Sequence, residues 1–504
     1  MGSLKYFFVF TLSLFCINKI VFSQENYINR LDTADFSSNY YYSLLNKNNS
    51  YYLFMPSILT NSEFANNFIV FNENFEMTNQ KRYTYGNIYT TRGKTHFNRD
   101  STKIYSFGLQ TYNGNSKGII ATYNLQGDSL AFFNVGDNTY NWRIIEAIEM
   151  PDHTILAVGG RSKYPVGGTN PWDEYPLAMK LDTLGNVLWT KLFTFTDRGL
   201  NLGVQQTLDG NYLLNSYTFF NPGTGTGSVY RPTLIKIDSL GNQLWYNRYG
   251  GSLQQNSGIS GIVEMEDSTL IFEAMLYKYN SILDGEEKYP AIFKTDKNGN
   301  VIWQKDYNDG ILGYASTGFR LSNNYFYSVG DKGRYGQSGK IAHLRKYDTE
   351  GNFIFEYNYE YFNSDTSFNG FLDFTQTPDS GFLCVGYTQY YSTDSIGPYR
   401  AWLVKTDKYG CIVQDCQLTG LEDIQELQEL SIFPNPSQNV FYINASQEIK
   451  NVSVFTINGN RILQENTKST FAKIDLTDFS SGMYFVEVQT EVGETNRRKV
   501  VKVE

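Results

Sequence analysis

The feature that most constrains the fold is a hairpin pattern that returns every 52–59 residues along most of the chain. Five segments place an Asp-x-x-Gly element between two short runs of alternating apolar and polar residues. Their opening acids are Asp182, Asp238, Asp296, Asp348 and Asp407. Two weaker copies carry an amide at the same position, at Asn72 and Asn124. A period of this length indicates a repeat architecture and argues against one large core.

Each Asp-x-x-Gly element predicts a tight turn between two strands. The Asp or Asn side chain accepts hydrogen bonds from the backbone ahead of it, and Gly takes the positive φ that joins the strands. Aromatic residues recur three positions after the Asn that usually follows this Gly, at Trp189, Trp245, Trp303 and Phe355. We therefore interpret these aromatic side chains as packing residues of the repeat.

A second hairpin follows each of the first six hairpins, so each unit has four short strands in up-and-down order. This order is typical of a propeller blade. The seventh unit, which begins at residue 401, lacks its second hairpin. Residues 40–57 contain two aromatic strands, and their pairing with 401–416 would close the ring and remove exposed sheet edges. The sequence predicts an all-β, seven-bladed β-propeller, with six or eight blades as alternatives.

The N-terminal residues 1–23 have the features of a signal peptide. Lys5 precedes a short apolar run over residues 6–17, and Val21 and Ser23 suit a cleavage before Gln24. The apolar run is too short for a membrane-spanning helix, and no later run approaches that length. We expect an exported protein without a transmembrane segment.

Charge and composition exclude several classes of protein. The chain has 42 Lys and Arg against 51 Asp and Glu, a net charge of −9 that does not suit binding to nucleic acid. Three separate His residues without metal-ligand spacing predict no metal site, and we expect no cofactor. The propeller contains no catalytic signature, so no catalytic residue is predicted. Export permits a disulfide between Cys411 and Cys416, and the spacing leaves this pairing open.

Long loops between the hairpins are the candidate binding regions. Long loops on a rigid scaffold often carry function, and these cover residues 161–176, 219–232, 276–290 and 388–400. Their aromatic rings suit a glycan or protein ligand because rings offer contact area at low entropy cost. The candidate ligand-binding residues are Tyr164, Trp172, Tyr230, Tyr279 and Tyr391. The alternative is that these rings pack between blades, since a Tyr recurs just before several strands.

A different pattern begins after the repeats. The acidic segment 417–430 predicts a linker, which places the propeller at 24–416, and residues 431–504 predict a small Ig-like β-sandwich. This last segment contains the characteristic residues Pro434, Asn435, Pro436, Gly482, Tyr484, Lys499 and Lys502. In their order, spacing and terminal position it resembles the C-terminal (type A) sorting domain of cargo of the type IX secretion system in Bacteroidetes.

The resemblance implies a route and leaves the activity open. It implies passage through the outer membrane by the type IX secretion machinery, removal of the sorting domain, and release or attachment to surface lipopolysaccharide. The repeats also resemble propeller-like repeats of such cargo, over about residues 40–416. Three functions stay open: a propeller that binds a glycan or protein, an extracellular polysaccharide hydrolase or lyase, and a structural protein of adhesion or gliding. We expect a monomer.

Overall fold

The structure is a computed structural model, and every regular element among its described residues is a β-strand. The chain divides into two compact units, Met1–Ile412 and Val413–Glu504. The predicted signal peptide at residues 1–23 lies outside the described residues. The structure describes residues 27–503 apart from 32–35, 40–42, 60–63, 85–87, 90–93, 113–114, 167–172, 197, 221–228, 251–257, 281–284, 308–314, 334–338, 363–365, 392–395, 413–429, 436, 457–459 and 492–494.

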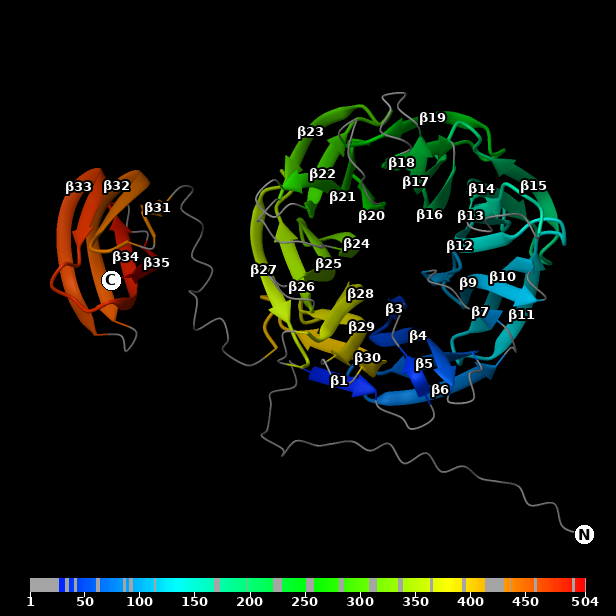
Figure 1. Cartoon of the computed structure of the whole chain (residues 1–504), viewed down its shortest axis with the longest axis horizontal. Coiled ribbons are helices and arrows are strands. Elements are labelled where there is room, and N and C mark those ends of the chain that lie inside the picture. Colours follow the sequence, from blue (N-terminus) through cyan, green and yellow to red (C-terminus); the bar gives the residue numbers. More distant parts are fainter. Residues whose placement is uncertain are drawn as a thin grey trace, which may run out of the picture. The chain divides into compact units, whose positions relative to one another are not determined.

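The first unit is a ring of seven antiparallel blades, each with its first strand toward the centre and its last at the rim (Figure 1). In the first two blades the inner position is shared by two short strands. The first blade contains β2 (Phe36–Asn39), β3 (Ser43–Lys47), β4 (Ser50–Leu59), β5 (Phe64–Phe71) and β6 (Met77–Thr84). The second contains β7 (Ile88–Tyr89), β8 (His96–Phe97), β9 (Lys103–Tyr112), β10 (Asn115–Asn124) and β11 (Ser129–Val135).

The next four blades each have four strands in chain order. The third contains β12 (Trp142–Glu149), β13 (Ile155–Ser162), β14 (Glu174–Leu181) and β15 (Val187–Leu192). The fourth contains β16 (Arg198–Gln206), β17 (Tyr212–Phe220), β18 (Val229–Ile237) and β19 (Gln243–Arg248). The fifth contains β20 (Ile259–Glu264), β21 (Leu270–Asn280), β22 (Gly285–Thr295) and β23 (Val301–Asp306). The sixth contains β24 (Ala315–Ser322), β25 (Tyr325–Gly333), β26 (Lys340–Tyr347) and β27 (Phe353–Tyr359).

The seventh blade closes the ring with strands from both ends of the propeller. It contains β28 (Phe368–Gln376), β29 (Phe382–Tyr391), β30 (Ile396–Thr406) and the N-terminal β1 (Tyr27–Leu31). Tyr27 of β1 lies opposite Lys405 of β30, and the antiparallel register continues to Leu31 opposite Ala401. The predicted closure by pairing of N- and C-terminal segments is therefore confirmed.

The segment predicted for that closure was wrong. Within residues 40–57, β3 and β4 pair with each other, and β4 pairs with β5 of the first blade. The connection between β4 and β5 is only residues 60–63, so β4 pairs with the strand that follows it in the chain. The second strand of the hairpin 401–416 was expected to pair with the first strand of that hairpin. In the structure β1 pairs with β30 at this outer position of the last blade.

The blades also begin one hairpin earlier than the sequence suggested, so the last blade starts at β28 and not at residue 401. β12 and β13 form the inner half of the third blade, and β14 and β15, joined by the Asp182 turn, form its outer half. The long connection 163–173 therefore joins the second and third strands of one blade. It lies on the same face as the blade-to-blade connections, because the second and fourth strands run in the same direction. We call this the loop face, and the opposite side, with the Asp-x-x-Gly turns, the turn face.

The Asp-x-x-Gly turns form as predicted. Asp182 Oδ1 accepts the backbone N–H groups of Leu184 at 2.9 Å and Asn186 at 2.8 Å. Gly185 has φ +85°, which only Gly adopts readily. The same Asx-turn geometry returns at Asp238 and Asp296. At Asp296, too, the carboxylate bonds its own backbone.

The recurring Trp residues pack on the turn of the next blade. A Cβ placed on Gly241 would lie 2.8 Å from the ring of Trp189, and one on Gly299 would lie 2.9 Å from the ring of Trp245. The turn Gly is thus required by its φ and also by the close approach of the preceding blade. This contact confirms the interpretation of these Trp residues as packing residues.

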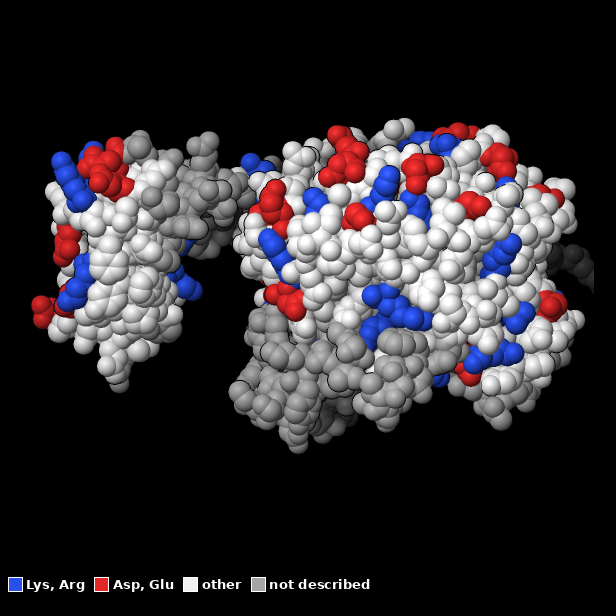
Figure 2. All heavy atoms as spheres, turned by 90° about the horizontal axis from the view of Figure 1, so that it is seen from above, with Lys and Arg blue, Asp and Glu red and all other residues white. Residues whose placement is uncertain are grey.

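The hydrophobic core consists of seven clusters, one between each pair of adjacent blades. The cluster at the closure joins buried Leu53 and Ile69 of the first blade to Val385 and Leu403 of the last. Packing therefore supports the closure that the β1–β30 pairing makes. On the side of the propeller seen in Figure 2, both acidic and basic side chains of the described residues are present.

The second unit is a small β-sandwich-like domain. Its strands are β31 (Leu430–Phe433), β32 (Val440–Thr456), β33 (Arg461–Asp475), β34 (Gly482–Thr490) and β35 (Thr495–Lys502). The long β32 pairs with β33 along one edge and with β31 and β34 along the other. Its core includes fully buried Phe441, Val454, Val486 and Val500. No helix in the described parts of the chain is long and apolar enough to cross a membrane.

Candidate ligand-binding sites

The predicted binding residues occupy different environments. Tyr164, in the connection between β13 and β14, is 47% exposed. Tyr230 lies in β18 with its ring 5.5 Å from that of Tyr217, and Tyr391 ends β29 with its ring 5.8 Å from that of Phe368. Trp172 and the side chain of Tyr279 lie outside the described residues. A role of these five residues in ligand binding stays a prediction.

An exposed group of aromatic rings lies on the loop face. Tyr361 and Phe362, between β27 and β28, have ring centroids 5.0 Å apart, and Phe362 lies 5.5 Å from Tyr390 of β29. Tyr361 is 41% exposed and Tyr390 is 42% exposed, although both rings are large and partly apolar. We call Tyr361, Phe362 and Tyr390 the aromatic cluster.

Hydrogen bonds beneath the aromatic cluster fix its backbone. The backbone N–H of Tyr361 donates to Asn369 Oδ1 at 3.1 Å. The same oxygen accepts from Thr388 Oγ1 at 2.9 Å, and both Asn369 and Thr388 are fully buried. Because Thr388 lies in β29 two residues before Tyr390, one buried amide ties together the two segments that carry the rings. The cluster is therefore preorganised for contact with a ligand.

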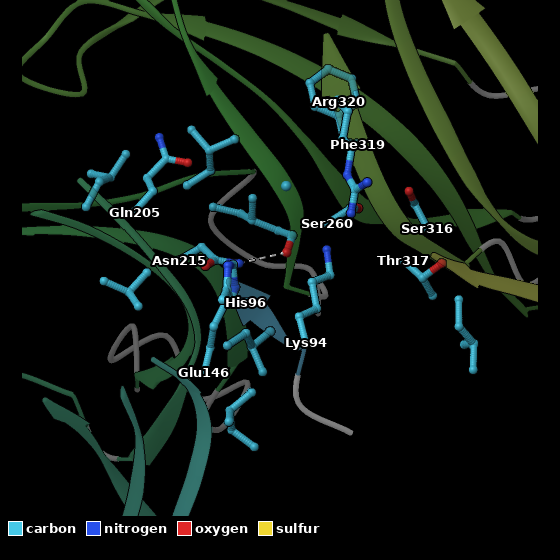
Figure 3. Close-up of a pocket in the computed structure, with 18 residues that line it drawn as sticks. Lys94, His96, Glu146, Gln205, Asn215, Ser260, Ser316, Thr317, Phe319 and Arg320 are labelled. Atoms are coloured by element: carbon cyan, nitrogen blue, oxygen red, sulfur yellow. Dashed lines mark hydrogen bonds and ion pairs between the residues drawn. The ribbon is translucent and has the colours of Figure 1, made fainter. Parts of the chain in front are cut away.

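A cavity of about 400 Å³ lies among the inner strands of the propeller (Figure 3). Its wall mixes apolar side chains with polar and charged ones, as ligand pockets commonly do. The polar and charged lining residues are Lys94, His96, Glu146, Gln205, Asn215, Ser260, Ser316, Thr317 and Arg320. They come from the second to the sixth blade, and Leu372 of the seventh completes the wall.

A repeated β-bulge builds the wall of this cavity. The inner strands of the third to seventh blades each shift register at the same point, where one extra residue leaves the ladder. A bulge of this kind re-aims a side chain. The bulged residues are Ile145, Leu202, Ser260, Thr317 and Leu372, and all five line the cavity.

The residue after each bulge carries a signal that sequence reasoning missed. Gly203, Gly261 and Gly318 occupy this position in three blades, but Glu146 and Asp373 replace Gly in the other two. An alignment of the inner strands would have shown these two acids as departures from the repeat. In the structure each of them pairs with a basic residue of the cavity wall.

The two acids contact two of the three basic side chains of the wall. Glu146 Oε1 forms a close ion-pair contact with His96 Nε2, which lies on β8 of the preceding blade. Asp373 Oδ1 lies 2.6 Å from Arg320 Nη2 and is almost fully buried. Asp373 also accepts the backbone N–H of Leu44 at 2.9 Å, so it connects the seventh blade to the sixth and the first.

Other polar groups of the wall have no such partner. Within the described part of the chain, neither the ammonium of Lys94 nor the amide of Gln205 has a hydrogen-bonding or ionic partner. The buried Ser260 Oγ likewise bonds to no described residue. These three groups provide hydrogen-bonding capacity that the protein itself does not use.

Glu273 lies behind the cavity wall. Its carboxyl group is fully buried, accepts the hydroxyl of Ser316, and lies 3.4 Å from the hydroxyl of Tyr347. Burial raises the pKa of Glu273 above its ordinary value. This effect is larger than the lowering of the pKa by these hydrogen bonds and by Arg345. Among the described residues no group of three or more His, Cys, Asp or Glu side chains is placed to hold a metal ion.

The cysteines of the propeller differ in state. Cys411 is disulfide-bonded, and Cys416, its predicted partner, lies outside the described residues. Cys384 is a free thiol in the core between the last two blades, where burial raises its pKa. The pairing of Cys411 with Cys416 therefore stays a prediction.

The residues of the C-terminal motif hold the second unit together. Asn435 donates from Nδ2 to the carbonyl of Lys499 at 2.9 Å and accepts the backbone N–H of Val501 at 2.9 Å, which attaches the segment after β31 to β35. The Tyr484 hydroxyl donates to the carbonyl of Ser480 at 2.6 Å. Gly482, two residues earlier, has φ +153°. Pro434 follows β31, and Pro436 lies outside the described residues.

Lys502 is the most heavily bonded residue of the motif. Its ammonium is largely buried and donates to the carbonyls of Leu476 at 2.8 Å, Thr477 at 3.2 Å and Phe479 at 2.6 Å. These carbonyls form the turn that leads into β34. The final strand is thus fixed to the turn that precedes its partner strand, which explains why a Lys is needed at this place.

Residues 431–502 match the family described as the secretion system C-terminal sorting domain. The C-terminal unit is a type IX secretion sorting domain. The resemblance found in the sequence is therefore confirmed, and the sorting domain marks the chain as cargo for export to the cell surface or the extracellular space.

Other comparisons give only distant similarity. Among curated proteins none matches the chain. PorZ of Porphyromonas gingivalis, described as an essential bacterial surface component of the type IX secretion system, is 10% identical, with 90% of this chain and 69% of PorZ covered and a TM-score of 0.29. The propeller domain of the Trilobed protease from Pyrococcus furiosus is 11% identical over 73% of this chain and 94% of that domain, with a TM-score of 0.39.

A polysaccharide lyase described as an ulvan lyase is 10% identical, with 75% of this chain and 96% of the lyase covered and a TM-score of 0.46. The seven-bladed ring is established by the strand pairing of this chain itself. The activities of these proteins are not transferred to it.

Proposed function

We propose that this type IX cargo is a glycan-binding protein and that the loop face of its propeller carries the binding site. The observation that supports this proposal is the aromatic cluster, where two tyrosines remain more than 40% exposed on a preorganised backbone. Aromatic faces pack well against the C–H faces of sugar rings, and the tyrosine hydroxyls offer hydrogen bonds at the edges.

The size of the cluster favours a glycan over a protein ligand. A stable protein interface buries about 800 Å² on each partner and is built around a larger hydrophobic centre. Three rings suit one or two sugar units better. The rigid ring of blades behind them holds the site without a conformational change on binding.

A glycan array tests the proposal with the chain from residue 24 onward. We expect binding to a restricted set of glycans, and Tyr361→Ala combined with Tyr390→Ala should weaken it by at least about tenfold, because each ring contributes an appreciable share of contact energy. Phe353→Ala is the control variant, because it removes a 47% exposed ring at the turn face and should leave glycan binding unchanged. Unchanged binding by the double variant, or no bound glycan at all, would refute the proposal.

A second candidate function is the degradation of an extracellular polysaccharide. The observation that favours it is the His96–Glu146 pair at the cavity wall. A His oriented by a carboxylate is a common arrangement for a general acid or base. Incubation with acidic and neutral polysaccharides would release new reducing ends in a hydrolase or unsaturated, ultraviolet-absorbing ends in a lyase. Activity that survives His96→Gln would exclude this pair as its source.

A further inference from the structure

We infer that the central cavity is a second binding site, and that its ligand is a small sugar acid held through its carboxylate. The volume of about 400 Å³ falls within the range of small-molecule sites. The wall consists largely of inner strands in the middle of the ring, so the site is already formed without its ligand. Its bulged residues aim into the cavity at the same level in five blades.

The unpaired ammonium of Lys94 favours an anion. Three basic side chains line the cavity, and two of them contact an acid of the wall, His96 with Glu146 and Arg320 with Asp373. Lys94 has no acidic partner among the described residues, and Figure 3 shows its ammonium directed into the cavity. An ammonium in a partly enclosed site attracts an opposite charge more strongly than one on an open surface. One negative charge on the ligand would balance Lys94.

The remaining polar groups favour a sugar acid over an inorganic anion. Gln205 presents an amide, a donor and an acceptor, and Asn215 keeps its carbonyl oxygen available while its Nδ2 donates to the carbonyl of Ile259 at 3.2 Å. Acceptors of this kind pair with hydroxyl groups and repel a bare anion. Ile145 and Leu202 supply apolar wall for the C–H face of a sugar ring.

This site is independent of the glycan site proposed at the aromatic cluster, although its wall includes the His96–Glu146 pair of the second candidate function. The aromatic cluster lies on the loop face in the β27–β28 connection and the end of β29, and none of its three residues lines the cavity. Variants of one site therefore leave the other intact, and failure of glycan binding at the cluster does not decide the inference about the cavity.

Calorimetric titration of the chain from residue 24 onward tests the inference. The probes are glucuronate, glucose, which lacks the carboxylate, and acetate, which lacks the ring. We expect glucuronate to bind at least about tenfold more tightly than either, since a hydrogen bond to a charged group is worth about that factor. Lys94→Gln should remove the preference for glucuronate over glucose, and Lys94→Arg should retain most of it.

Two further variants establish whether glucuronate occupies the cavity itself. Lys297→Gln removes an exposed lysine of the turn face and should leave glucuronate binding unchanged. Leu202→Trp fills the cavity and should abolish it. The inference is overturned if glucuronate does not bind, if glucose binds equally well, if Lys94→Gln binds like the wild type, or if only the Tyr361 and Tyr390 variants weaken glucuronate binding.

Discussion

The packing of Trp189 on Gly241 leads to a quantitative prediction with a control inside the same blade. Gly241 and Gly210 both lie in turns of the fourth blade and have nearly the same positive φ, +78° and +80°. A Cβ on Gly241 would lie 2.8 Å from the Trp189 ring, whereas a Cβ on Gly210 has no atom within 4 Å. The Gly241→Ala and Gly210→Ala variants therefore differ in one physical respect, the contact of the added methyl with the neighbouring blade.

The magnitudes follow from these two contributions. An L-residue in the left-handed region costs about 1–2 kcal/mol, and this cost applies to both variants. Forcing an extra methyl into a packed contact costs about 1–3 kcal/mol more, and this applies to Gly241→Ala alone. We expect Gly210→Ala to destabilise the propeller by about 1–2 kcal/mol and Gly241→Ala by about 2–5 kcal/mol.

Denaturant unfolding followed by circular dichroism measures both variants, alone and in a Trp189→Ala background. Without the ring only Lys191 Cγ, at 2.9 Å, stays close to the added methyl, and this flexible side chain can move, so the cost of Gly241→Ala should fall toward that of Gly210→Ala. The double-mutant cycle isolates the contact as the coupling free energy between positions 189 and 241. Equal destabilisation by the two Ala variants in the wild-type background, or a Gly241→Ala cost that Trp189→Ala leaves unchanged, would refute the packing role of Trp189.

Three other predictions concern the sorting domain, the closure and the buried acid. Lys502→Met leaves three backbone carbonyls without their charged donor and should lower the free energy of unfolding of the sorting domain by about 3 kcal/mol. We expect faster hydrogen exchange at residues 476–479 and less secreted protein, and unchanged exchange would contradict this prediction. Deletion of residues 27–31 exposes the edge of β30 and should lower the thermal midpoint and produce oligomers by size-exclusion chromatography, so a stable monomer would argue against closure by β1. Burial raises the folded-state pKa of Glu273 above 4.5, so the folded state binds the proton more tightly and wild-type stability falls as pH rises from about 4.5 toward the folded-state pKa. Glu273→Gln removes this loss, and its thermal midpoint relative to the wild type should rise as the pH increases above about 4.5; a constant difference would contradict the raised pKa.

The turns and the number of blades were predictable because their chemistry is local. An Asp that bonds its own backbone two and four residues ahead, and a Gly with positive φ, are specified within five residues, as at Asp182 and Gly185. The export route was equally local, since the resemblance rested on residues within one short module, among them Asn435 and Lys502, whose contacts lie inside the sorting domain.

The start of each blade was not predictable, because it depends on pairing between hairpins. β13 pairs with β14 across the connection 163–173, from Ile155 opposite Leu181 to Ser162 opposite Glu174. A connection between two blades, such as 193–197, can be shorter than this connection within a blade. The sequence of the two connections does not indicate which of them joins strands of the same sheet. β1 is five residues long and carries no turn motif. Its role in the closure could not be predicted, because it follows only from the unpaired edge that β30 presents in the folded ring.

The cavity was hidden for a related reason. A bulge is a property of the register between two strands, and it decides that Ile145 and Ser260 face the centre. Lys94 and His96 lie at a short inner strand that has no counterpart in the repeat pattern. On β29 the choice between adjacent Tyr390 and Tyr391 depends on which side of the strand faces solvent, and Tyr390 is the more exposed of the two.

In a repeat protein the recurring residues explain the scaffold, and functional residues are best sought among the exceptions. Many of the aromatic residues belong to the scaffold: the hydroxyl of Tyr249 donates to the carbonyl of Gly299 at 3.0 Å, and that of Tyr359 to Gly410 at 2.6 Å, each joining one blade to the turn of the next. Tyr361 lies two residues beyond that recurring position and remains exposed. Glu146 and Lys94 also depart from the repeat. Three other blades have Gly at the position of Glu146, and the short inner strand beside Lys94 has no counterpart in the repeat pattern. The aromatic cluster and the cavity are thus the two places where the sequence departs from what seven interlocking blades require.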